Sequence, residues 1–261
     1  MDSKTKITVV GSAIFSIVLG LSVLVGWVFG ISILIKIHPD FTPMTIGAAT
    51  SFVLSGFTLW LSLLQKCTLN LLIRVLGTII AIIASLFLLE HLLSINLFVD
   101  LSDIHRPFSH QLIPGRMAIN TAIAFFLFSI GLLMLSYQHE IQIQRALYKI
   151  SSYLSLVIIF IALMGLLGYL MHLEELYAWT SLSRMAFHTT IGLIILGYGL
   201  WNLSLYKLKE ITFAPQKNKI LTTSFAMMML ISIITSIASF ATLEELIEKS
   251  IFNDYRTRVI D

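Results

Sequence analysis

The sequence is poor in charge and in cysteine, and both shortages exclude whole classes of protein. Only 12% of its 261 residues are charged, whereas 57% are hydrophobic. In a water-soluble domain about a quarter of the residues would be charged. The single cysteine, Cys67, excludes a disulfide framework within the chain and fits no zinc-binding spacing. We therefore expect a polytopic membrane protein in which Cys67 is an ordinary buried or interfacial thiol.

Catalytic signatures are missing as well. The sequence has no glycine-rich phosphate-binding loop, no plausible Ser-His-Asp or Cys-His arrangement and no zinc-protease helix motif. The net charge of +3 comes from residues that flank apolar runs, which indicates orientation in a lipid bilayer rather than affinity for nucleic acid. We expect no enzymatic activity of the chain's own, no cofactor and no nucleic-acid partner.

Seven apolar runs are long enough to cross the hydrocarbon layer, which takes about 20 helical residues. The first run is much longer than the roughly 7 to 15 apolar residues of a signal-peptide core, and no cleavage site follows it. The expected fold class is therefore all-α, a polytopic bundle of about seven transmembrane helices. The predicted spans are residues 7–35, 44–65, 75–98, 117–137, 150–173, 185–206 and 220–243.

Short phrases recur along the chain and predict a repeated unit. Residues 115–122 (GRMAINTA) recur in altered form as residues 183–190 (SRMAFHTT), and more faintly as residues 42–49 (TPMTIGAA). A second set of phrases, in residues 24–31, 88–95 and 166–173, aligns with an aromatic-type ring at the same place in each copy. This self-similarity indicates a two-helix hairpin present three times, with the seventh helix appended. Two spans per copy make these parallel rather than inverted repeats.

Basic residues are divided unevenly between the two sides of the predicted bundle. One side has Lys4, Lys6, Lys66, Arg74, Arg145, Lys149, Lys207, Lys209, Lys217 and Lys219, and the other has Lys36, Arg106, Arg116 and Arg184. The richer side is expected to be cytoplasmic and to include the amino terminus. Residues 1–243 would then form a seven-helix domain in a bacterial cytoplasmic membrane. Residues 244–261 would form a periplasmic or extracellular amphipathic stalk or tail.

Polar side chains inside lipid are costly and mark candidate functional positions. Glu90 is the only acidic residue within a predicted span, about 12 Å of helix from the outer end of that span. Asn120 and His188 occupy the same position in two copies of the repeat. The predicted ligand or proton site comprises Glu90, His91, Arg116, Asn120, Arg184 and His188. The alternative is that these side chains only hydrogen-bond neighbouring helices, which stabilises a membrane protein by about 0.6 kcal/mol each.

Two other groups of residues have ligand chemistry without a recognisable spacing. Asp100, Asp103, His105 and His110 on the long outer loop resemble a divalent-metal set, yet a solvated polar loop is the favoured interpretation. His91 and His188 are a conceivable axial pair for a haem, although a lone histidine near a helix end is more often a packing residue.

Three phrases resemble a known class of membrane sensor. They are PGRMAINTA (residues 114–122), LLEHL (residues 88–92) and RMAFHT (residues 184–189). They are similar to the multi-span amino-terminal sensor regions of bacterial histidine kinases and diguanylate cyclases, the membrane-associated sensor (MASE-like) class, over roughly residues 7–243. The resemblance implies an input module for two-component or cyclic di-GMP signalling. Its output would lie on a downstream domain or on a partner protein, with a homodimer as a further option.

We therefore expect a sensory or signal-input module that responds near the outer leaflet to an unknown small ligand or to a state of the surrounding lipid bilayer. One alternative is a small permease or proton-coupled transporter that uses Glu90, Asn120 and His188 as its path. Another is a haem-binding redox membrane protein. Solute flux in proteoliposomes would identify the permease, and an absorption spectrum would identify the haem protein.

Overall fold

The computed structural model describes residues 3–64, 67–95, 97, 99–109, 113–137, 140–180, 182–211, 227–229 and 231. The chain divides into two units, Met1–Pro215 and Gln216–Asp261, and the elements named below all belong to the first. The predicted seventh span at 220–243 lies outside the described residues, apart from 227–229 and 231. The predicted stalk at 244–261 lies outside them entirely.

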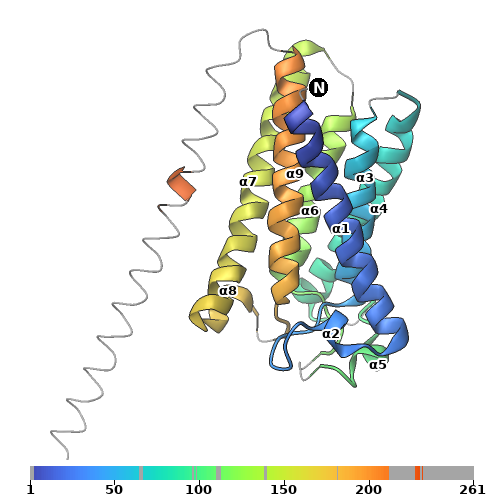
Figure 1. Cartoon of the computed structure of the whole chain (residues 1–261), viewed down its shortest axis with the longest axis vertical. Coiled ribbons are helices and arrows are strands. Elements are labelled where there is room, and N and C mark those ends of the chain that lie inside the picture. Colours follow the sequence, from blue (N-terminus) through green and yellow to red (C-terminus); the bar gives the residue numbers. More distant parts are fainter. Residues whose placement is uncertain are drawn as a thin grey trace, which may run out of the picture. The chain divides into compact units, whose positions relative to one another are not determined.

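Six helices in the described part of the chain are long and apolar enough to cross a membrane. They are α1 (Ser3–Phe29), α3 (Ile46–Leu63), α4 (Asn70–Leu93), α6 (Ile119–Ser136), α7 (Ile141–Met171) and α9 (Phe187–Ile211), shown in Figure 1. The described residues contain no β-strand, which confirms the all-α class. The chain is a multi-pass membrane protein.

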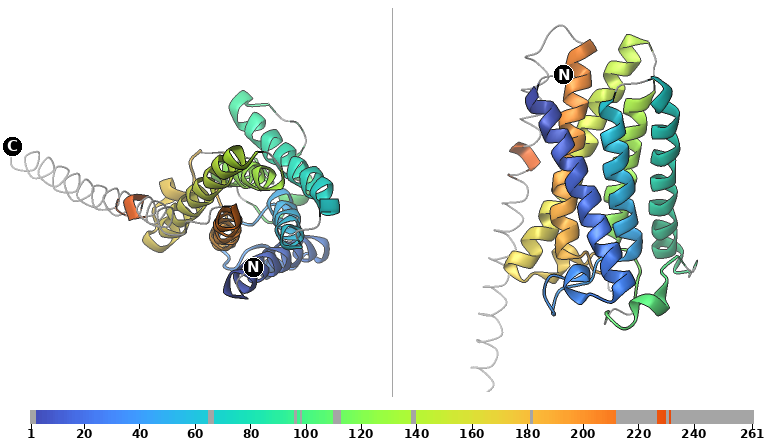
Figure 2. Two further views of the ribbon diagram at one scale, coloured as in Figure 1. Left: turned by 90° about the horizontal axis from the view of Figure 1, so that it is seen from above. Right: turned by 45° about the vertical axis from the view of Figure 1, so that its right-hand side comes forward.

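These helices form three antiparallel pairs, each with one inner and one outer helix. We call α1 with α3 the first pair, α4 with α6 the second and α7 with α9 the third. The second members α3, α6 and α9 contact one another in the interior, and the first members α1, α4 and α7 lie outside them (Figure 2). Each outer helix packs on its own partner and on one other inner helix: α1 on α9, α4 on α3, and α7 on α6.

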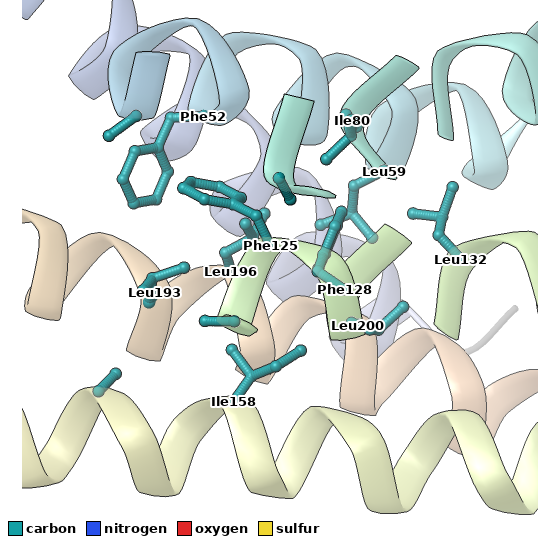
Figure 3. Close-up of a cluster of buried hydrophobic side chains, with 14 of the residues drawn as sticks. Phe52, Leu59, Ile80, Phe125, Phe128, Leu132, Ile158, Leu193, Leu196 and Leu200 are labelled. Carbon is teal, nitrogen blue, oxygen red and sulfur yellow. The ribbon is translucent and has the colours of Figure 1, made fainter. Parts of the chain in front are cut away.

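Large apolar side chains fill the space between the three inner helices. Phe52, Phe125 and Phe128 are fully buried and meet leucines of α9 at the centre of the bundle (Figure 3). Small residues bring α1 and α3 into close contact at the edge of this core. A methyl group on Gly56 would lie 2.6 Å from the carbonyl oxygen of Ala13. Such small residues are what lets membrane helices approach closely.

The three outer helices end in the same conformation. Gly30, Ser94 and His172 follow their last turns with positive φ values of 67°, 52° and 56°, the left-handed conformation that commonly ends a helix. A helix of four residues follows in each pair: α2 (Ser32–Ile35), α5 (Ser102–His105) and α8 (Glu174–Tyr177). One residue separates the left-handed position from the short helix in the first and third pairs, whereas residues 95–101 separate them in the second.

We call the end of the bundle that holds residues 30–45, 94–118 and 172–186 the long-loop end, and the opposite end the short-loop end. The predicted spans follow the helices in order but miss several of their ends. The first span is broken after α1 by Gly30, and the fifth begins at Ile141 rather than at 150. The third ends at Leu93 rather than at 98, so Glu90 lies in the last turn of α4. The predicted depth of Glu90 within its span was wrong.

Candidate functional site

Three charged side chains are buried together at the long-loop end, in the second helix pair. Glu90 comes from the last turn of α4, Asp100 from the loop that follows, and Arg116 from the segment just before α6. Their side chains are 0%, 1% and 2% exposed, respectively. The Nε atom of Arg116 lies 3.3 Å from Oδ2 of Asp100 and 3.8 Å from Oε2 of Glu90. We call these three residues the charged cluster.

We call the connections between α1 and α3, α4 and α6, and α7 and α9 the first, second and third loops. Hydrogen bonds to the backbone hold the start of the second loop against this cluster. The guanidinium of Arg116 donates through Nη2 to the carbonyl oxygen of Ile95 at 3.0 Å. Glu90 accepts a hydrogen bond at Oε1 from the amide of Leu97 at 2.8 Å. The loop between α4 and α5 is therefore held by the side chains of the cluster, and changes in their charge bear directly on its position.

Gly115 makes room for the cluster. Its φ of +86° is a conformation that side-chain-bearing residues rarely adopt. A methyl group on this residue would overlap the carbonyl oxygen of Asp100 and lie 2.5 Å from Nδ1 of His105. The glycine thus lets the segment before α6 lie directly against the second loop.

His105 connects the second pair to the first. Its Nδ1 donates to the carbonyl oxygen of Leu101 at 3.0 Å, so its Nε2 is left to accept the amide of Ile46 at 3.1 Å, at the first residue of α3. The ring also lies 4.3 Å from that of Trp27, centroid to centroid. Because Nε2 acts as an acceptor, the imidazole is neutral. Burial lowers the pKa of His105 below its ordinary 6.5, which agrees with this bonding.

The neighbouring carboxyl groups affect each other strongly. Burial is the largest cause that raises the pKa of Asp100, from 3.8 to about 7, followed by its hydrogen bond with Glu90 and by the charge of Glu90. The guanidinium of Arg116 acts in the opposite direction but is outweighed. One cation beside two buried carboxylates cannot neutralise both, so one of the acids retains its proton up to about neutral pH.

Ring side chains tie each outer helix to the start of its inner partner. In each pair the ring donates a hydrogen bond to the carbonyl oxygen of a methionine. The bonds run from Trp27 to Met44 at 2.9 Å, from His91 to Met117 at 2.8 Å and from Tyr169 to Met185 at 2.7 Å. In the second pair Nε2 of His91 also lies 3.3 Å from Oγ of Ser183. His91 therefore closes its own pair and touches the third.

The remaining predicted site residues lie apart from the cluster. Asn120 donates to the carbonyl oxygen of Tyr177 at 3.3 Å, and Arg184 is half exposed and pairs with Glu174. His188 is buried, and neither of its ring nitrogens has a hydrogen-bond partner among the described residues. No hydrogen bond or ion pair described in the structure joins Asn120 or His188 to the cluster. The structure thus brings together Glu90 and Arg116, with His91 adjacent in sequence.

Sequence reasoning missed Asp100, because it treated the whole second loop as solvated. That interpretation fits Asp103, whose side chain is 96% exposed beside Arg106. It is wrong for Asp100 and His105, which are both buried. His110 lies outside the described residues, and within the described part no three such side chains are placed to hold a metal ion.

Comparison of the chain with models of protein families, with curated proteins and with solved structures finds no match. The fold and the cluster together define a multi-pass membrane protein that has a buried, partly compensated charge at one end of its bundle.

Proposed function

We propose that the chain is a membrane-embedded input module of a bacterial signalling protein, which responds at the long-loop end and has no catalytic activity of its own. The observation that carries the proposal is the position of the charged cluster. Buried charge is expensive and is usually functional in a membrane protein. Here it lies between a loop and a transmembrane helix, where a change in its charge or contacts can shift both.

The packed interior favours an input module over a permease. Phe52, Phe125 and Phe128 occupy the centre of the bundle, where a solute path would have to run (Figure 3). The hydroxyl groups of Ser16 and Ser62 are typical of the buried ones, since they donate to carbonyl oxygens of their own helices. Hydroxyl groups bonded in this way already have their acceptor within the helix, so they are not placed to bind a solute on its way through the bundle.

The haem alternative has less support. Nε2 of His91, the atom that would bind iron, donates to the carbonyl oxygen of Met117. Binding a haem there would break a contact that closes the second pair, and Trp27 and Tyr169 make the corresponding contact in the other two.

We infer further that the three pairs are copies of one hairpin. The three bonds from a ring to a methionine carbonyl support this, as do the left-handed residues that end α1, α4 and α7. A third kind of support is the matching approach of two inner helices to their outer partners. A methyl on Gly56 would meet the carbonyl oxygen of Ala13, and one on Gly197 would meet that of Ser155 at 3.2 Å. We also propose a seventh transmembrane helix at residues 220–243, on the evidence of the apolar sequence alone.

The proposed orientation places the amino terminus and the short-loop end in the cytoplasm and the long-loop end outside, following the distribution of Lys and Arg. A signal received at the cluster would then cross the bundle to the cytoplasmic short-loop end. With a seventh span placing residues 244–261 outside, the output domain there would belong to a partner protein that resembles the histidine kinases and diguanylate cyclases. A homodimer would supply a second route for the signal.

The test is whether a change at the cluster reaches the opposite end of the bundle. We would compare hydrogen exchange in the unaltered chain and in Glu90→Gln, in lipid nanodiscs, at the short-loop end (residues 63–70 and 136–145). An input module predicts altered exchange at that end, and Asp103→Asn, an exposed carboxyl in the same loop, should leave it unchanged. Altered exchange confined to residues 94–118 would contradict the proposal. Solute or proton flux in proteoliposomes that depends on Glu90 would favour the permease.

A further inference from the structure

We propose that Glu90 and Asp100 together bind one exchangeable proton, and that this proton is the ligand to which the long-loop end responds. Its role as the stimulus rests on the proposed input function, whereas occupancy of the site by a proton does not.

The charge count leaves one negative charge over. Glu90, Asp100 and Arg116 are at most 2% exposed, so two carboxyl groups share a single guanidinium. An uncompensated carboxylate in such a place is strongly destabilising, and a group in that position takes up a proton instead. The cluster becomes neutral when one proton is bound.

The geometry provides a place for that proton. One oxygen of Glu90 already accepts the amide of Leu97, and one oxygen of Asp100 faces Arg116. The other two, Oε2 of Glu90 and Oδ1 of Asp100, are buried and have no hydrogen-bond donor among the residues that the structure describes. The two carboxyl groups lie within hydrogen-bonding reach of each other. A proton on one of them supplies the donor that the arrangement is missing.

The histidines around the cluster do not supply the missing positive charge. His91, on α4, uses Nε2 to donate to Met117, and its buried Nδ1 has no acceptor within the described part of the chain for a second proton. His105, on α5, accepts the amide of Ile46 and must be neutral to do so. Arg116 is therefore the cation that faces Glu90 and Asp100 within the described residues.

The site is expected to bind and release its proton near neutral pH. Burial, the hydrogen bond with Glu90 and the charge of Glu90 raise the pKa of Asp100 to about 7, against the influence of Arg116. Below that pH the cluster is neutral and the loop is held to α4. Above it, the repulsion between two buried carboxylates and the cost of burying the excess charge favour release of the loop, which carries the change to α4.

Infrared difference spectroscopy of the full chain tests the site directly. A protonated carboxyl group has a carbonyl stretching band that a carboxylate lacks, so a titration from pH 5 to pH 9 reports its loss. The sample is purified in a detergent without ester groups, which would absorb in the same region. We expect one band that disappears with a midpoint near pH 7 in the unaltered chain. We expect it to be absent in both Glu90→Gln and Asp100→Asn, because each leaves one carboxylate paired with one arginine.

The matched control is Asp103→Asn, which removes an exposed carboxyl group from the same loop and should leave the band and its midpoint unchanged. The proposal is overturned if the unaltered chain shows no such band, or if the band survives in both cluster variants. If a cluster variant does not fold, hydrogen exchange of residues 94–109 in the unaltered chain decides. After correction for the intrinsic pH dependence of exchange, it should accelerate about tenfold or more between pH 6 and pH 8, and no acceleration would count against the site.

These outcomes separate the two proposals. A band that titrates as expected, in a chain whose short-loop end does not respond to Glu90→Gln, would retain the proton site and remove the input function. A responsive short-loop end without the band would retain the input function and require another ligand.

Discussion

The second helix pair differs from the first and third in the chemical group that holds the chain where the outer helix ends. Where α1 and α7 end, a glycine carbonyl oxygen accepts the amide five residues further on: Gly26 from Ile31 at 2.9 Å, and Gly168 from Leu173 at 2.8 Å. At the matching position α4 has Glu90, whose side chain accepts the amide of Leu97 at 2.8 Å.

The three loops therefore differ in how we expect their stability to depend on pH. Backbone hydrogen bonds that hold the first and third loops do not change between pH 5 and pH 9. The second loop is longer and depends on ionisable side chains, so proton binding or another change of charge alters its stability. The left-handed helix end and the bond from a ring to a methionine carbonyl are common to the three pairs, whereas the buried charged cluster belongs to the second.

The largest expected effect comes from removing the positive charge of the cluster. Arg116→Gln leaves two buried carboxyl groups without a cation and should lower the free energy of unfolding by about 3 to 5 kcal/mol at pH 8. Arg184→Gln is the matched control, because it changes the corresponding position of the third pair, where the arginine is half exposed beside Glu174. It should cost less than about 1 kcal/mol. Equal losses in unfolding experiments in micelles would remove the distinction between the pairs.

A smaller loss is expected when the second loop is pushed away from the segment before α6. Gly115→Ala places a methyl group against the carbonyl oxygen of Asp100 at a φ of +86°, and should cost about 3 kcal/mol. Gly11→Ala serves as its control, because a methyl group there meets nothing within 4 Å. That change should be neutral or stabilise α1 by about 0.5 to 1 kcal/mol. Thermal unfolding of both variants provides the measurement, and a stable Gly115→Ala protein would show that the loop tolerates displacement.

The smallest effect concerns the contact between the second and first pairs. The pKa of His105 is lowered in the folded protein, so its contribution to stability is present above pH 6.5 and is lost as the pH falls through the folded value. His105→Phe keeps a ring against Trp27 but removes the acceptor for Ile46, which should cost about 1 kcal/mol at pH 7. Stability measured between pH 7 and pH 5 should fall less in this variant than in the unaltered chain. A parallel fall in both would assign the acid sensitivity to another group.

Much of the architecture was predictable from the sequence, because long apolar runs report membrane spans directly. The six described helices followed from such patterns, and so did the choice of Glu90 as an acidic residue to examine, which the structure shows to be buried. The end of α4 did not, since apolar residues continue to position 98 and hydropathy measures apolar character rather than helix termination. The left-handed Ser94 ends the helix, and a serine gives little warning of that conformation.

The burial of Asp100 was beyond sequence reasoning for a different reason. Its environment is created by residues distant in the chain, namely Glu90, Gly115 and Arg116, which meet only after the second loop has folded. A polar residue in a loop is usually solvated, and local sequence holds no sign of the exception. Asn120 and His188 stand at the same position in two similar phrases of the sequence, yet no hydrogen bond or ion pair described in the structure joins either of them to Glu90.

A double-mutant cycle on Glu90→Gln and Asp100→Asn is the most direct test of the central claim, that the two acids share one proton and one arginine. At pH 8 each single change removes the excess negative charge, so neither should destabilise the protein. The double variant leaves Arg116 buried without an acid and should lose about 3 kcal/mol. At pH 5 the cluster already holds its proton, so any gain in stability from a single change should be smaller than at pH 8. Effects that simply add at both pH values would show that the two carboxyl groups do not act together.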